Sequence, residues 1–112
     1  MTPGDVLLIR LQLANATAPK LRPALLLADL PGPYQNLLVC GISTQVQQIV
    51  RDWDEVLAPG QPDYAASGVR RASAIRLSYL YAATSGEVAG RIGRIEDQRL
   101  HRLRDRLIDR LR

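Results

Sequence analysis

The chain has 112 residues, enough for one domain with a modest core and too few for two, and with 46% hydrophobic residues we expect it to fold. Its single cysteine, Cys40, excludes an internal disulfide, and the sequence shows neither an apolar run of membrane-spanning length nor a signal-peptide pattern. The net charge is +4, and Lys20 is the only lysine among 15 basic residues. Arginine suits a polyanionic partner such as nucleic acid, although the codon usage of GC-rich genomes predicts the same bias. These features predict a single domain over residues 1–112, located in the cytoplasm and not bound to a membrane.

The N-terminal segment has the alternation of a strand with one apolar face. Between residues 5 and 13, every second side chain is aliphatic: Leu7, Ile9, Leu11 and Leu13. Residues 14–19 are small or polar, so they predict a loop, and this loop leads into Lys20 and Arg22.

Two short apolar runs, residues 20–28 and 37–45, have the length and composition of buried strands, and we expect them to pair. Arg22 lies at the start of the first run, where Pro23 favours an extended conformation for the residue before it. Ser43 ends the second run. If the two strands are antiparallel neighbours, the start of one lies beside the end of the other. The guanidinium group of Arg22 and the hydroxyl group of Ser43 then face one pocket.

The remaining strands are short and separated by proline and glycine. Residues 52–57 are extended, and residues 63–68 form a turn or a short helical piece in which Gly68 suits a positive φ. Alternation in residues 73–81 places Ile75, Leu77, Tyr79 and Tyr81 on one face and Ala74, Arg76, Ser78 and Leu80 on the other. Residues 88–95 predict a last strand, in which Gly90 and Gly93 indicate close packing or a bulge.

The C-terminal tail has the period of an amphipathic helix. Its leucines recur at three- and four-residue steps, at Leu100, Leu103, Leu107 and Leu111. Arginines cover its other faces, and intrahelical pairs with aspartate explain them more simply than contact with RNA does. The whole chain therefore predicts a mainly β fold, a small and strongly bent antiparallel sheet or barrel followed by one α-helix.

Several kinds of catalytic site are excluded by composition. One histidine and one cysteine cannot form a structural zinc site, and no carboxylates have the spacing of metal ligands. No glycine-rich phosphate-binding or dinucleotide-binding motif is present, so the sequence predicts no metal and no cofactor. His101 is the only histidine and lies in the tail helix, which excludes a ribonuclease mechanism based on two histidines.

Arg22 and Ser43 are sufficient for one reaction, the cleavage of RNA by attack of its own 2′-hydroxyl group. This reaction needs no nucleophile from the protein, because it only requires the phosphate to be held in line and its growing negative charge to be stabilised. The arginine fork binds two phosphate oxygens, and a neighbouring hydroxyl donates one further hydrogen bond. Arginine is a poor general base, so the group that accepts the proton is left open.

Five segments resemble the PemK/MazF family of toxin endoribonucleases, in order and over nearly the full length of the chain. They are Gly4-Asp5-Val6, Arg22-Pro23 with the aliphatic run after it, Ile42-Ser43-Thr44-Gln45, Ser67-Gly68-Val69-Arg70-Arg71 and Ser73-Ala74-Ile75-Arg76-Leu77. The resemblance implies an SH3-like barrel, an architecture shared with CcdB-like toxins. It also implies a metal-independent, sequence-selective endoribonuclease that acts on single-stranded RNA and leaves a 2′,3′-cyclic phosphate.

The same resemblance implies roles for individual residues. Arg22 and Ser43 match the arginine and the serine or threonine that are associated with catalysis, and Arg71 matches a second arginine implicated in some members. Those members carry an acidic residue two positions later, where this chain has Ser73, so a carboxylate base is not available there. We expect the RNA to be bound by Lys20, Thr44, Gln45, Arg71 and Ser73.

In biological terms, the resemblance implies the toxin of a type II toxin–antitoxin pair. Such a toxin is a homodimer with an RNA groove at its interface, and the antitoxin places a flexible acidic and apolar tail in that groove. Two alternatives keep the same barrel: a DNA-gyrase poison that binds without catalysis, and a degenerate, non-catalytic SH3-like binding module. The pairing of Arg22 with Ser43 favours the nuclease, because a gyrase poison needs no such pocket.

Overall fold

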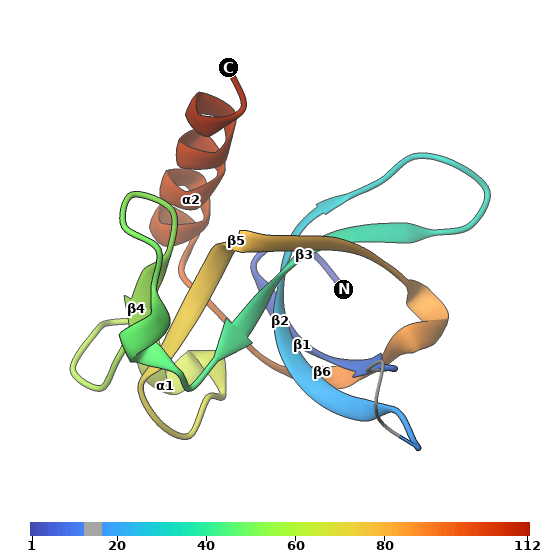
Figure 1. Cartoon of the computed structure of the whole chain (residues 1–112), viewed down its shortest axis with the longest axis horizontal. Coiled ribbons are helices and arrows are strands. Elements are labelled where there is room, and N and C mark those ends of the chain that lie inside the picture. The colour runs from blue at the N-terminus through green and yellow to red at the C-terminus, as the bar shows by residue number, and fades with distance from the viewer. Residues whose placement is uncertain (13–16) are drawn as a thin grey trace.

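The six strands of the described chain form one antiparallel sheet in the order β4-β5-β3-β2-β1-β6 (Figure 1). This computed structural model describes residues 1–12 and 17–112. The strands are β1 (Asp5–Leu11), β2 (Lys20–Asp29), β3 (Asn36–Ser43), β4 (Glu55–Leu57), β5 (Ser73–Thr84) and β6 (Val88–Arg94). The helices are α1 (Tyr64–Ser67) and α2 (Asp97–Arg110), and two 3₁₀ turns are η1 (Val46–Gln48) and η2 (Ser85–Glu87). The mainly β fold with a C-terminal helix is thus confirmed, while no pairing among the described strands joins β4 to β6 and closes the sheet into a barrel.

Both faces of the sheet are buried, which explains the unbroken apolar runs of β2 and β3. Alternate residues point to opposite faces, so Leu25 and Leu27 enter one cluster while Ala24 and Leu26 enter the other. The helix-side core lies between the sheet and α2 and consists of Val6, Leu25, Leu27, Cys40, Ile42, Leu57, Ile75, Leu77, Ile95, Leu100, Leu103 and Leu107. The inner core lies on the opposite face, around which the sheet curves, and consists of Leu7, Ile9, Ala24, Leu26, Leu37, Val39 and Ala83.

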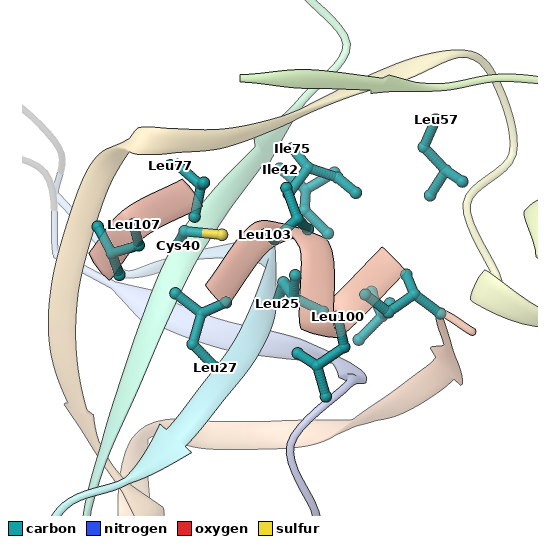
Figure 2. Close-up of a cluster of buried hydrophobic side chains, with 12 residues drawn as sticks. Leu25, Leu27, Cys40, Ile42, Leu57, Ile75, Leu77, Leu100, Leu103 and Leu107 are labelled. Carbon is teal, nitrogen blue, oxygen red and sulfur yellow. The ribbon is translucent and has the colours of Figure 1, made fainter. Parts of the chain in front are cut away.

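Helix α2 packs on the sheet through the predicted leucine stripe, as Figure 2 shows. Leu100, Leu103 and Leu107 are buried, and each contributes roughly 1.5–3 kcal/mol by leaving water. Leu111 was expected in the same stripe but is 70% exposed, because it follows the last helical residue and lies beyond the core. No helix in the described part of the chain is both long and apolar enough to cross a membrane.

The arginines of α2 bind other elements, which corrects the expectation of intrahelical pairs. Arg99 is buried and binds Asp63 through two hydrogen bonds of 2.8 and 3.1 Å, while its Nη1 donates to Glu55 at 2.9 Å. Arg102 and Arg106 also donate to the Glu55 carboxylate, each at 2.8 Å. These contacts, here called the Arg99 cluster, join α2 to β4 and to the start of α1.

Two glycines allow α1 to lie against β6. Gly68 ends α1 with a φ of +80°, as its position in the sequence predicted. A side chain at Gly68 would meet the carbonyl oxygen of Ile92 at 2.1 Å, and one at Gly93 would meet the carbonyl oxygen of Ala66 at 2.3 Å. The close packing predicted for Gly93 is therefore confirmed.

Removing the central arginine of the Arg99 cluster tests its contribution to stability. We expect Arg99→Met to lower the free energy of unfolding by about 3–5 kcal/mol, because it leaves the buried carboxylate of Asp63 without its counter-ion. Urea unfolding at pH 7 measures the loss. His101→Ala, an exposed change on the same helix, is the control and should alter the midpoint very little. Equal midpoints for the two variants would contradict this account.

The same cluster predicts how stability depends on pH. Burial raises the pKa values of Asp63 and Glu55, but hydrogen bonds from Arg99 and Arg102 respectively outweigh it and hold both values below the ordinary 3.8 and 4.5. A lowered folded-state pKa gives stability that is complete above the ordinary pKa and is lost as the pH falls through the folded one. Urea midpoints should therefore change little above about pH 5 and fall steeply below the ordinary values. Asp63→Asn should show a shallower fall, and an unchanged slope in this variant would contradict the assignment.

Candidate functional site

The antiparallel pairing of β2 with β3 brings the start of one strand beside the end of the other, as expected. Ala24 is opposite Gly41, and continuing this register by two residues places Arg22 opposite Ser43. Both residues line a pocket of about 470 Å³. Thr44 and Gln45, which follow Ser43, line it as well.

The pocket lies on the inner-core side of the sheet, where four neighbouring strands supply its wall. Gly41 and Ser43 belong to β3, with Arg22 on one side of them and β5 on the other. The lining residues are Leu11, Arg22, Pro23, Gly41, Ile42, Ser43, Thr44, Gln45, Arg76, Tyr79 and Tyr81. None of these described lining residues is an aspartate or a glutamate, so the pocket wall holds Arg22 and Arg76 but no carboxylate.

A bulge in β5 turns Tyr79 and Tyr81 into the pocket beside Arg76, contrary to the alternation expected from the sequence. Arg76 is opposite Gly41, but the next pair along β3 is Cys40 with Leu80, so residues 77–79 lie between the two pairs. An odd number of inserted residues reverses which face the later side chains take. Leu80 therefore packs against the helix-side core like Leu77, while Tyr79 and Tyr81 line the same pocket as Arg76.

The bulge is held by a buried carboxylate just before β4. Asp54 accepts hydrogen bonds from the backbone N–H of Ser78 at 3.0 Å and from its hydroxyl at 2.9 Å. It also accepts the backbone N–H of Val50 at 2.8 Å, and its Oδ2 lies 3.9 Å from Nε of Arg76. Asp54 thus supplies acceptors for the bulged backbone and a negative charge behind the Arg76 guanidinium.

The polar groups of the pocket are mainly hydrogen-bond donors. The Nε of Arg76 and the hydroxyl of Tyr81 are buried and have no hydrogen-bond partner among the described residues. Burial, with a smaller contribution from the neighbouring Tyr79, raises the pKa of Tyr81 to about 12, so its phenol keeps its proton at neutral pH. The Ser43 hydroxyl accepts the backbone N–H of Gln45 at 3.1 Å, which leaves its own hydrogen to donate elsewhere. Such a set fits an anionic, oxygen-rich ligand.

The other residues expected to bind RNA lie outside this pocket wall. Lys20 is exposed and opposite Leu11, and Arg71 is exposed in the turn before β5. Ser73 is buried, and its hydroxyl donates to the carbonyl oxygen of Arg71 at 2.9 Å. The sequence pattern does not identify Arg76 as a site residue and predicts it on the opposite face from Tyr79 and Tyr81. The available signal was the three-residue step from Leu77 to Leu80, which breaks the alternation.

Other reactive or charged features are already accounted for. A groove of about 600 Å³ runs along α2, but its arginines Arg102 and Arg106 bind Glu55, and Arg110 donates to the carbonyl oxygen of Asp52 at 3.1 Å. Cys40 is fully buried in the helix-side core, and burial raises its pKa to about 12, so it is not a nucleophile at neutral pH. The pocket around Arg22 and Ser43 is the better candidate for chemistry.

Replacing Asp54 tests whether it holds the bulge. In Asp54→Ala the N–H groups of Val50 and Ser78 lose their acceptor at a cost of about 1–3 kcal/mol each, so we expect a clearly lower urea midpoint. The NMR shifts of the Tyr79 and Tyr81 ring protons should change as well. Ser78→Ala is the matched control, because it removes only the hydroxyl and keeps the backbone contact. Unchanged ring shifts in Asp54→Ala would show that the bulge forms without this carboxylate.

The chain was also compared with known proteins. No protein-family model matches it, and no curated protein matches it either. The likeness to the PemK/MazF toxins therefore rests on the five sequence segments, and the geometry of the pocket is an independent observation beside them.

Proposed function

We propose that this protein is a metal-independent endoribonuclease that cleaves single-stranded RNA in the pocket between β2, β3 and β5. The observation that carries the proposal is the composition of the pocket wall. Arg22, Ser43 and Arg76 line it together, and no carboxylate is among its described lining residues. A phosphodiester supplies the anionic oxygens that these donors need.

The proposed reaction is an internal transesterification. The 2′-oxygen of one ribose forms a bond to the adjacent phosphorus, the bond from phosphorus to the 5′-oxygen breaks, and the products are a 2′,3′-cyclic phosphate and a 5′-hydroxyl. The proton lost from the 2′-hydroxyl is balanced by the proton gained by the 5′-oxygen. The five-coordinate phosphorus carries more negative charge than the substrate, so donors fixed around it accelerate the step.

Each residue has a distinct part in this proposal. The Arg22 fork binds two non-bridging oxygens, and the Ser43 hydroxyl donates to one of them from the opposite position on β3. Arg76, opposite Gly41, adds a second positive charge from the other side. The Asp54 carboxylate behind Arg76 orients this guanidinium without entering the pocket wall.

The wider proposal follows the sequence resemblance. We infer that the sheet is a variant of the SH3-like barrel of PemK/MazF toxins and that the chain is the toxin of a type II toxin–antitoxin pair. It would act in the cytoplasm as a homodimer and be inhibited by a cognate antitoxin. The basic surplus of +4 is compatible with both an RNA ligand and an acidic antitoxin tail.

The test is RNA cleavage in excess EDTA with mapping of the new 5′ ends. We expect discrete cuts by the wild type and a fall in kcat of about 10²–10³ in both Arg22→Lys and Ser43→Ala, because each loses a donor to the transition state. Arg112→Ala changes an exposed arginine at the C-terminus, is the control and should cut like the wild type.

Two results would contradict the proposal. If Arg22→Lys, Arg22→Ala and the wild type cleave RNA at equal rates, Arg22 does not bind the phosphate in the reaction. If the purified wild type cuts no RNA while its expression still arrests growth, the non-catalytic gyrase-poison class becomes the better explanation.

A further inference from the structure

We propose that Tyr79 is a stacking platform for a nucleobase of the bound strand, directly beside the phosphate-binding donors. This inference rests on the proposed function, because it assigns the base-binding part of the same pocket. Tyr79 lines the pocket together with Arg22 and Ser43 and is 45% exposed, although it lies within a long strand of the sheet. Ligand pockets are commonly lined by aromatic side chains together with a few polar groups.

Gly41 gives the Tyr79 ring its seat on the sheet. A Cβ atom built on Gly41 would lie 3.2 Å from Cδ2 of Tyr79 and 3.7 Å from its Cγ. The ring therefore lies close over the backbone of β3, nearer than most side chains would allow. One part of the ring is supported by the protein, while nearly half of the residue surface is open to solvent.

Tyr81 supports the same ring from the side. The two ring centroids are 5.3 Å apart with an interplanar angle of 46°, which is within the range of favourable aromatic pairs. Tyr81 is itself packed against the inner core. Because Gly41 and Tyr81 hold the Tyr79 ring in place, the Tyr79 side chain would lose little conformational entropy when a planar ligand stacks on it.

The spacing along β3 suits one nucleotide. Gly41 lies under Tyr79, and Ser43 is two residues further along the same strand, which corresponds to about 6.7 Å. Ser43 and Arg22 hold the phosphate in the proposed reaction, so a base joined to that phosphate through one ribose can reach the ring. Tyr81 lines the same pocket, and its hydroxyl is buried beside it.

A base stacked on a tyrosine contributes about 1–3 kcal/mol, whatever its identity, because every base has a π-face. We therefore expect Tyr79 to provide affinity at one nucleotide position rather than to select one base. Sequence selectivity would then come from groups that read the base edge. Among the lining residues, Gln45 and Thr44 carry suitable donors and acceptors.

The experiment is a double-mutant cycle that combines removal of one base from the ligand with removal of the Tyr79 ring from the protein. The affinity of each pair is measured by fluorescence anisotropy at fixed salt. The probes are single-stranded DNA hexanucleotides, which have no 2′-hydroxyl and cannot be cleaved by the proposed reaction, with each base in turn replaced by an abasic sugar. For the wild type, one abasic position should weaken binding about tenfold or more. In Tyr79→Leu the intact hexanucleotide should bind about tenfold more weakly, and the abasic change at that position should cause no further loss.

Three variants separate stacking from a structural effect. Tyr79→Phe keeps the ring and should bind like the wild type, whereas Gly41→Val pushes the ring from its seat and should behave like Tyr79→Leu. Tyr34→Leu changes a tyrosine that is 76% exposed in the loop between β2 and β3, at the opposite end of both strands, and should change nothing. The same abasic penalty in Tyr79→Leu and in the wild type would overturn the inference.

The cycle and the cleavage assay can fail separately. RNA cleavage that depends on Arg22, with no coupling between Tyr79 and any base, would overturn the stacking platform and keep the nuclease. Coupling without cleavage would keep the platform and overturn the nuclease. If no hexanucleotide binds the wild type at any concentration tested, the platform is overturned, and the exposed Tyr79 becomes a candidate contact for a protein partner.

Discussion

The Asp54 carboxylate is the contact on which the pocket depends. Residues 77–79 interrupt the pairing of β5 with β3, so the N–H of Ser78 needs an acceptor from elsewhere, and Asp54 provides it. A buried carboxylate is itself costly unless it is bonded, and here it accepts two backbone N–H groups and a hydroxyl and lies 3.9 Å from the charge of Arg76. The Ser78 N–H group that needs an acceptor and the buried Asp54 carboxylate that needs donors therefore stabilise each other. One consequence is that the side chains of β5 after the bulge point to the opposite face of the sheet from the one that a regular strand would give them.

Local sequence patterns predicted the features that depend on neighbouring residues. Two short apolar runs were enough to expect that β2 and β3 pair, and their antiparallel pairing brings Arg22 to Ser43. The bulge was not predicted, because Asp54, the residue that stabilises it, is 24 positions away from Ser78 and belongs to a segment that the sequence predicts only as extended. Arg76 and the two tyrosines were therefore assigned to opposite faces. The part of the pocket wall that β2 and β3 supply follows from local pattern, whereas the part that β5 supplies depends on one long-range hydrogen bond.

Composition alone did not distinguish the arginines either. Most of those on α2 and β6 have structural partners: Arg99, Arg102 and Arg106 bind Glu55 or Asp63, Arg91 and Arg94 bind Asp5, and Arg104 donates to the carbonyl oxygen of Leu27. Arg22 has no ion pair among the described residues, and only Arg76 shares its pocket. An arginine-rich sequence thus contains two populations. The arginines of one population bind carboxylates or carbonyl oxygens of neighbouring elements, while Arg22 belongs to the other, and only tertiary contacts separate them.

The donors of the pocket are left unpaired at a cost that a purely structural site would avoid. Within the described chain, the buried side-chain atoms without a hydrogen-bond partner are Nε of Arg76 and the hydroxyl of Tyr81, and both residues line this one pocket. A buried donor without any partner costs about 1–3 kcal/mol relative to a bonded one, and the Asp54 charge, 3.9 Å from Nε of Arg76, offsets part of this cost for Arg76. A methionine and a phenylalanine at these positions would fill similar space without that cost. The buried side-chain atoms that lack a hydrogen bond within the described chain therefore lie at one place, beside Arg22 and Ser43.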